Sequence, residues 1–150
     1  MGGVIVKGAI HDAFMTGPET AVELFHGYTY SGHPVAAAAA HATLDVIREE
    51  GLIGRARELA PVLEQAVHSL KGEPGIADIR NIGLAAAVEL EPVPDKPGVR
   101  ALRVFERAIE DGMLFRFTGD TIAMAPPYIA TQAEIETMIE KLRSAIRAVR

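Results

Sequence analysis

The second half of the chain alternates between two hydrophobic periods, and this order constrains the fold more than any other feature. Residues 76–91 and 114–125 carry short apolar runs with the character of strands. Residues 99–111 and 131–149 instead repeat apolar side chains at the helical period of 3.6. The order strand–strand–helix–strand–strand–helix predicts one compact unit that contains both strands and helices.

Two local signals support this order. Gly119 and Asp120 separate the last two predicted strands and favour a tight turn. Thr131 is followed three residues later by Glu134, which is the pattern of a capping box at the start of the final helix.

The first half has a different organisation, with two long predicted helices over residues 33–50 and 52–70. The first helix contains five consecutive alanines, Ala36 to Ala40, so it is apolar on every side and predicted to be buried all round. Ser31 is its predicted N-cap. Pro61 lies inside the second helix and predicts a kink or a break there.

Residues 3–7 (GVIVK) form a short β-branched run that predicts a buried strand at the start of the chain. One strand cannot form a sheet alone. A length of 150 residues suits one domain. The first half nevertheless resembles the edge of a larger domain rather than a complete one. We therefore predict two parts, of which residues 76–150 form the compact second one.

Composition excludes several classes of function. A net charge of −5 and a pI of about 5.5 give no basic footprint for nucleic acid, and no Lys/Arg block indicates a membrane-binding surface. The uncharged stretch 24–44 carries three histidines, several glycines and Pro34, which argues against a transmembrane span. The N-terminus is apolar first and basic afterwards, the reverse of a signal peptide. The absence of cysteine excludes disulfides and thiolate chemistry and agrees with a cytoplasmic location.

Most standard catalytic motifs are absent from the sequence. The position two residues before Ser31 is Thr29, so the nucleophile elbow is not formed, and no phosphate-binding P-loop is present. The five histidines have no metal-binding spacing. Lys7 ends an apolar run and has the chemistry for a Schiff base, but a solvated charge is the interpretation we favour.

Two segments suit the binding of anions. Residues 26–34 (HGYTYSGHP) are dense in hydroxyls and glycines and lead directly into a helix N-terminus. This pattern indicates either a binding site for a phosphate or another anion, or an ordinary capped helix start. Arg116 lies among apolar residues on a short strand. It is predicted either to lie at an edge in water or to clamp a carboxylate.

These segments together resemble the class III aminotransferases, which are fold-type I pyridoxal-phosphate enzymes, and most closely the omega-amino acid (β-alanine):pyruvate branch. Residues 1–6 (MGGVIV) resemble the strand just after the cofactor-binding lysine. Residues 26–34 with the alanine-rich helix are the most specific match, and residues 112–127 resemble the late strand pair of the small domain. The resemblance covers essentially all 150 residues.

The resemblance implies a role for three residues. Thr29 would hydrogen-bond the phosphate of pyridoxal 5'-phosphate held by the opposite subunit of a homodimer, with Tyr28 beside it. Arg116 would be the mobile arginine that binds the carboxylate of an amino or keto acid. Residues 1–70 would be the end of the large α/β domain, including long interface helices. Residues 71–150 would be the small α+β domain, with a short antiparallel sheet and covering helices.

The resemblance also implies a missing group. The family's Schiff-base lysine lies shortly before the position that Met1 matches, and Lys7 does not occupy its motif position. We therefore expect the parent enzyme to transfer an amino group from a donor to pyruvate or another keto acid, and this chain alone to be inactive. Two alternatives stay open: a non-enzymatic interaction or oligomerisation domain with a transaminase-derived fold, and part of another class III enzyme such as a decarboxylase or aminomutase.

Overall fold

The computed structural model of the chain describes residues 2–20 and 27–149. It contains two compact units, Met1–Ile47 and Arg48–Arg150, and each is described by itself. Met1 and residues 24–26 take part in predicted features (the opening match, the uncharged stretch and the start of the phosphate segment), and they lie outside the described residues. Among the described residues, no helix is both long enough and apolar enough to cross a membrane.

The first unit holds α1 (Gly8–Phe14) and nearly all of α2 (Pro34–Glu49). The predicted strand over residues 3–7 is wrong, because this segment has no regular structure. The side chains of Val4 and Ile5 are 91% and 100% exposed. A strand needs a hydrogen-bonded neighbour to satisfy its backbone, and the described part of the chain offers none to this segment.

The alanine-rich helix forms close to its predicted bounds, but the prediction that it is buried all round is also wrong. None of the described residues of α2 is buried. An all-round apolar sequence makes burial favourable only where other elements pack against every side, and the described residues supply no such packing here. The apolar sequence of α2 therefore gives the helix a surface suited to burial, and this surface is exposed in the described residues.

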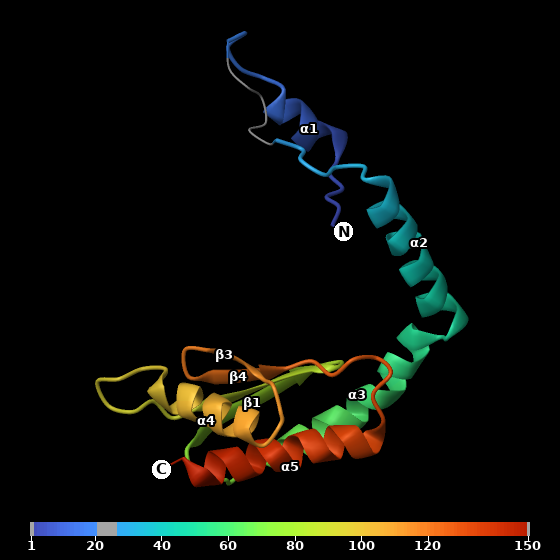
Figure 1. Cartoon of the computed structure of the whole chain (residues 1–150). Coiled ribbons are helices and arrows are strands. Elements are labelled where there is room, and N and C mark those ends of the chain that lie inside the picture. The colour runs from blue at the N-terminus through green and yellow to red at the C-terminus, as the bar shows by residue number, and fades with distance from the viewer. Residues whose placement is uncertain (1, 21–26, 150) are drawn as a thin grey trace. The chain divides into compact units, whose positions relative to one another are not determined.

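The second unit contains the predicted antiparallel sheet with helices covering one face (Figure 1). All three strand pairings are antiparallel, and the strands lie in the order β1-β2-β4-β3. This confirms the α+β arrangement predicted from the hydrophobic periods. The elements are α3 (Leu52–His68), β1 (Ile76–Ile82), β2 (Ala85–Leu90), α4 (Val99–Glu110), β3 (Arg116–Thr118), β4 (Thr121–Met124) and α5 (Gln132–Ala148).

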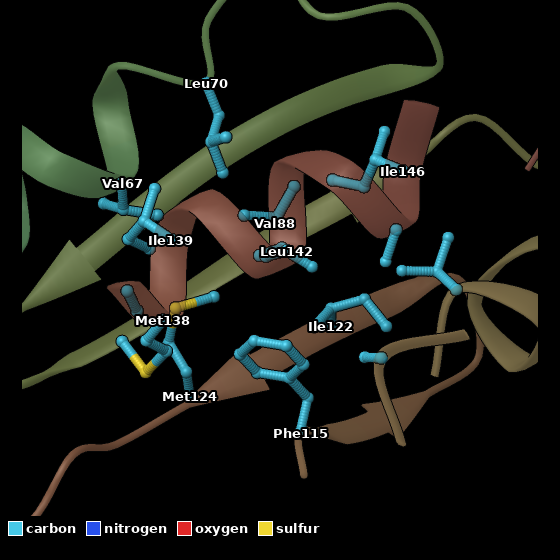
Figure 2. Close-up of a cluster of buried hydrophobic side chains, with 14 of the residues drawn as sticks. Val67, Leu70, Val88, Phe115, Ile122, Met124, Met138, Ile139, Leu142 and Ile146 are labelled. Carbon is cyan, nitrogen blue, oxygen red and sulfur yellow. The ribbon is translucent and has the colours of Figure 1, made fainter. Parts of the chain in front are cut away.

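The core of this unit lies between the sheet and its helices (Figure 2). Val88 on β2 and Ile122 on β4 are each 0% exposed, and Leu142 on α5 packs into the same cluster at 0%. Alternate residues on each strand point to the helices, as the period of two requires. The opposite face of the sheet is left open and has its own chemistry, described below.

α3 belongs to the second unit rather than to the first. Leu63 and Val67 on this helix are fully buried in the core of the second unit. The division of the structure therefore falls before α3, whereas the sequence analysis places its boundary at residue 70. The helix is also continuous through Pro61, so two separate helices are not formed. The assignment of residues 1–70 to a larger domain stays a prediction.

Local polar contacts fix the ends of these elements. The capping box predicted at α5 is confirmed: the Thr131 hydroxyl accepts from the Glu134 N–H at 3.2 Å, and the Glu134 carboxylate accepts from the Thr131 N–H at 2.8 Å. The β3–β4 turn is also confirmed, with Gly119 at φ +55°. Both carboxylate oxygens of Asp120 accept from the Gly98 N–H at 2.9 Å, which ties this turn to the start of α4.

A cluster of three charged side chains holds the C-terminal half of α5 to the turn after α3. The carboxylate of Glu73 accepts hydrogen bonds from Arg147 at 2.7 and 2.8 Å and from Arg143 at 2.5 Å. The Glu73 side chain is 9% exposed. Hydrogen bonds from Arg147, and then from Arg143, lower the pKa of Glu73 from 4.5 to about 2.

Candidate functional site

The predicted phosphate segment folds into overlapping turns. The Ser31 N–H donates to the Tyr28 carbonyl at 2.9 Å, and the His33 N–H donates to the Tyr30 carbonyl at 3.2 Å. Tyr28, Tyr30 and Gly32 have φ values of 50°, 63° and 70°, so every second residue is left-handed. Alternating left-handed residues also occur in the backbone nests that bind anions, but here the N–H groups of Ser31 and His33 already donate within the turns.

Left-handed backbone at two tyrosines costs free energy. A side chain in this conformation is disfavoured by roughly 1–2 kcal/mol per residue, because Cβ approaches the next carbonyl oxygen. Strained backbone of this kind is concentrated at binding sites. The geometry of Tyr28 and Tyr30 therefore marks this segment as a candidate binding site on its own account.

His33, and not Ser31, caps the N-terminus of α2, whose first residue is Pro34. The His33 carbonyl accepts from the Ala37 N–H at 2.9 Å, and its Nδ1 accepts from the Ala36 N–H at 3.4 Å. The prediction of Ser31 as the N-cap is thus wrong. Ser31 lies in the turn before the helix, because Pro34 occupies the first helical position and shifts the cap by two residues.

The turns border a hollow of about 540 Å³ at the N-terminus of α2. Residues 29–33 and Ala36 line it, together with Gly2. The lining supplies two kinds of donor, the hydroxyls of Thr29 and Ser31 and backbone N–H groups, at the positive end of a 16-residue helix. Donors of this kind suit a phosphate group. Hydrogen bonds and a helix dipole can hold such an anion even though no lysine or arginine lines this hollow.

Arg116 is the first residue of β3 and pairs with Ala123 on β4. Its side chain is exposed on an edge strand, which is the edge position that the sequence analysis allowed. Within the described part of the chain, the Arg116 guanidinium has no hydrogen bond or ion pair. It is therefore open to a carboxylate from outside these residues.

Two hollows meet at Arg116. One lies on the open face of the sheet, has a volume of about 490 Å³ and is lined by alanines of β2 and β4. The other, of about 500 Å³, lies at the end of the sheet beside Pro126, Pro127 and the start of α5. Arg116 is thus among the residues that border both hollows.

Two residues that position this region were missed by the sequence analysis. Arg55 on α3 donates to the carbonyls of Tyr128, Ile129 and Ala130 at 2.8, 3.2 and 2.9 Å, and so holds the loop that walls the second hollow. No sequence signal links α3 to this loop, since the partners are 73–75 residues apart. The other is Asp120. The Gly-Asp pair predicted that Asp120 lies in a turn, but nothing in the sequence predicted its contact with the start of α4.

The predicted site residues fall into two groups. Tyr28 and Thr29 lie in the first unit and Arg116 in the second, and the structure describes each unit by itself. Lys7 is exposed, and its carbonyl accepts from N–H groups in the first turn of α1. In the part of the chain that the structure describes, no three His, Asp or Glu side chains are grouped so as to hold a metal ion.

Comparison with known proteins adds the family context. The model of the family Aminotransferase class-III matches residues 1–146. An omega-aminotransferase of Caulobacter vibrioides is 46% identical over 148 residues, which are 99% of this chain and 34% of that protein. A beta-alanine–pyruvate aminotransferase of Pseudomonas aeruginosa is 39% identical over 151 residues, again 99% of this chain and 34% of that protein.

Solved structures give the same result. A thermostable omega transaminase from Pseudomonas jessenii superposes with a TM-score of 0.78 at 34% identity, over 85% of this chain and 30% of the other. The omega transaminase from the same species in complex with PMP gives 0.77 at 34% identity, over 84% and 29%. This chain thus spans about a third of the length of the proteins it matches.

Proposed function

The chain belongs to the class-III aminotransferase family, and we propose that it is the C-terminal part of a pyridoxal-phosphate-dependent omega-amino acid (β-alanine):pyruvate transaminase. The parent enzyme would move the amino group of a donor amine or of a β- or ω-amino acid to pyruvate. The observation that carries the proposal is the unpaired, exposed guanidinium of Arg116 in a chain that is similar to such enzymes over 99% of its length.

The first unit would hold the phosphate of the cofactor. Pyridoxal 5'-phosphate, when bound, supplies the electron sink that amino-group transfer requires. The Thr29 hydroxyl, with backbone N–H groups that the turns do not use, would donate to the phosphate oxygens, and the α2 N-terminus would favour their negative charge. In a homodimer these donors would serve the cofactor of the opposite subunit, with Tyr28 beside the same phosphate.

The second unit would orient the substrate. A guanidinium presents a planar fork of donors that matches a carboxylate in a bidentate arrangement. Arg116 would bind the carboxylate of the amino or keto acid in this way and turn aside for amines that lack one. The exposed position of the side chain, beside a hollow on the open face of the sheet, supports this role.

The chain would supply contacts for cofactor and substrate but no lysine for the covalent and proton-transfer steps. We also place the parent enzyme in the cytoplasm, which the absence of cysteine supports. The test of the missing lysine uses the purified 150-residue chain with added pyridoxal phosphate, pyruvate and β-alanine. After gel filtration removes free pyridoxal phosphate, which itself absorbs near ~400 nm, we expect no stoichiometric band at this wavelength on the chain, and we expect no turnover with the cofactor present.

A matched variant makes this test specific. Lys7→Ala should behave as the unaltered chain does, because Lys7 is exposed beside α1 and lies outside the family's lysine motif. A band that the substitution abolishes would show that Lys7 serves as the Schiff-base residue and would refute the proposal.

The exposed apolar side chains of the first unit favour one alternative. Val4, Ile5 and Val35 are 91%, 100% and 71% exposed, and α2 has no buried residue. Such a surface suits a non-enzymatic interaction or oligomerisation domain that keeps a transaminase-derived fold. The coding sequence upstream of Met1 separates the two ideas: a lysine-bearing cofactor domain in the same reading frame supports the enzyme, and a start signal directly before Met1 supports the interaction domain.

A further inference from the structure

The corner after α4 contains a pair of residues whose peptide bond can rearrange. Asp111 is followed by Gly112, and no other aspartate or asparagine in the 150 residues precedes a glycine. The nitrogen of the residue after an aspartate can attack the side-chain carboxyl. A glycine at that position leaves the attack unhindered, because glycine has no Cβ and turns freely. The sequence thus places one reactive pair at the C-terminal end of α4.

The rearrangement is balanced and needs no reagent except water. The Gly112 nitrogen forms a bond to Cγ of the protonated Asp111 carboxyl, the Cγ–OH bond breaks, and the hydroxyl leaves with the amide proton as water. The cyclic imide that results then takes up one water. Opening at Cγ restores aspartate, whereas opening at the main-chain carbonyl carbon gives isoaspartate, in which the main chain runs through Cβ and Cγ. The mass of the chain is unchanged.

In the folded chain the attacking nitrogen is already engaged. The Gly112 N–H donates to the Ile109 carbonyl at 2.8 Å, and the Met113 N–H donates to the Ala108 carbonyl at 2.8 Å. With Gly112 at φ +75°, these bonds form a Schellman motif. Asp111 has a ψ of 9°, which turns the Gly112 nitrogen away from the Asp111 side chain. Ring closure needs a large rotation about this bond, so the Schellman motif must open first.

Two cations hold the other groups of the pair. The Lys141 Nζ on α5 donates to the Asp111 carbonyl at 2.7 Å, so the peptide group that must rotate is fixed at its oxygen as well as at its nitrogen. The Arg107 guanidinium donates to the Asp111 carboxylate at 3.1 Å and favours the ionised form, which has no hydroxyl to lose. The Asp111 side chain is 29% exposed. Its protection therefore comes from these contacts rather than from burial.

We infer that Asp111–Gly112 is a modification site that the fold masks: isoaspartate forms there when the corner opens, and Lys141 is the side chain that keeps the corner closed. The inference is independent of the proposed function. Isoaspartate adds one carbon to the main chain inside both hydrogen-bonded rings of the Schellman motif. The carbonyl of Ala108, a residue that is 0% exposed, then loses its partner. A chain modified while open refolds with a damaged corner, so unfolding becomes irreversible with time.

The test follows isoaspartate in the full 150-residue chain at mildly acidic pH, where part of the carboxyl is protonated. Samples are kept folded in buffer or unfolded in guanidinium chloride and are then digested with trypsin. Trypsin cuts after lysine and arginine and releases peptide 108–116, in which Asp111 is the one aspartate. Its two isomers are separated by chromatography, and the protease Asp-N cuts only the ordinary one. Peptide 72–80, in which Asp78 precedes a β-branched residue, is the internal control.

Isoaspartate in peptide 108–116 should accumulate in the unfolded chain at nearly the rate of a synthetic peptide 108–116 in the same denaturant. In the folded chain it should accumulate at least about tenfold more slowly, because the corner must open first. Peptide 72–80 should stay unmodified in both samples. Lys141→Met removes the hydrogen bond to the Asp111 carbonyl and should raise the folded rate several-fold. Lys71→Met, on the exposed turn after α3, is the matched control and should not.

A third variant separates local opening from global unfolding. Leu142→Ala removes core packing beside Lys141 and lowers the stability of the whole unit while leaving the contacts of the corner in place. Lys141→Met should be the faster of the two in the folded state, although denaturant titration should show it to be the more stable. Equal rates in folded and unfolded chain, or no isoaspartate in the unfolded chain, overturn the inference. A folded rate that is no faster in Lys141→Met than in Lys71→Met overturns it as well.

Discussion

The charged cluster around Glu73 makes a sharp prediction about acid stability. The substitution Glu73→Gln keeps the shape of the side chain but removes its charge. The wild-type carboxylate accepts charge-assisted hydrogen bonds from Arg147 and Arg143, which together hold α5 to the turn before β1. We expect the free energy of unfolding of the variant to be lower than that of the wild type at pH 7.

The pH dependence of this difference follows from the pKa of Glu73. Its value in the folded chain is about 2, below the ordinary 4.5 expected after unfolding, so folding favours the ionised form. The carboxylate's contribution to stability is therefore complete above about pH 4.5 and is lost as the pH falls toward 2. Over this window the unfolded chain takes up as much as one more proton than the folded chain, which sets the slope of stability against pH.

The assay is urea unfolding of both proteins at intervals from pH 7 to pH 3, with ¹³C NMR of the Glu73 carboxyl as a direct probe of its titration. The difference in the free energy of unfolding should be constant from pH 7 to pH 5 and shrink below pH 4.5. Glu64→Gln on the exposed side of α3 is the control and should give no such trend. A difference that stays the same at pH 7 and pH 3, or a Glu73 midpoint near 4.5, refutes the reasoning.

Three further predictions concern other parts of the molecule. Leu142→Ala in the core should cost about 2–5 kcal/mol of unfolding free energy, measured by denaturant titration, because the side chain is 0% exposed and leaves a cavity; a cost below ~1 kcal/mol would contradict the packing. Arg55→Gln should speed amide hydrogen exchange in the loop before α5, and Arg55→Lys should only partly restore protection, since one ammonium cannot replace the guanidinium fork. In the protein extended by its upstream coding sequence, Thr29→Val should weaken pyridoxal-phosphate binding about tenfold in an equilibrium titration, and an unchanged affinity would remove Thr29 from the phosphate site.

Features with a local cause were predicted correctly. The capping box of Thr131 and Glu134 and the turn at Gly119 depend on residues within a few positions of one another. The hydrophobic periods of the second half likewise report which face of each element is buried. Because the small sheet and its helices bury those faces against each other, the period was enough to predict the arrangement.

Features that depend on a distant partner were not predicted. The strand at residues 3–7 and the burial of the alanine helix require neighbours that the described residues do not provide. The amphipathic stripe of α3 showed that the helix packs against something, but not that it packs into the second unit. The contact of Arg55 with three carbonyls depends on the tertiary fold alone. At the candidate site, the sequence indicated Tyr28, Thr29 and Arg116, while the hollow beside Arg116, over the alanines of β2 and β4, required the strand register.

The strand order also bears on how the chain behaves at high concentration. It leaves β1 as a seven-residue edge whose outer side, among the described residues, meets no further strand. An open edge of this length is a template for pairing with another chain, and charged side chains are a common means of preventing it. Asp78 and Arg80 stand on this edge, half exposed and ion-paired. These charges would thus oppose aggregation, and their replacement by apolar residues would make the chain less soluble before it made it less stable.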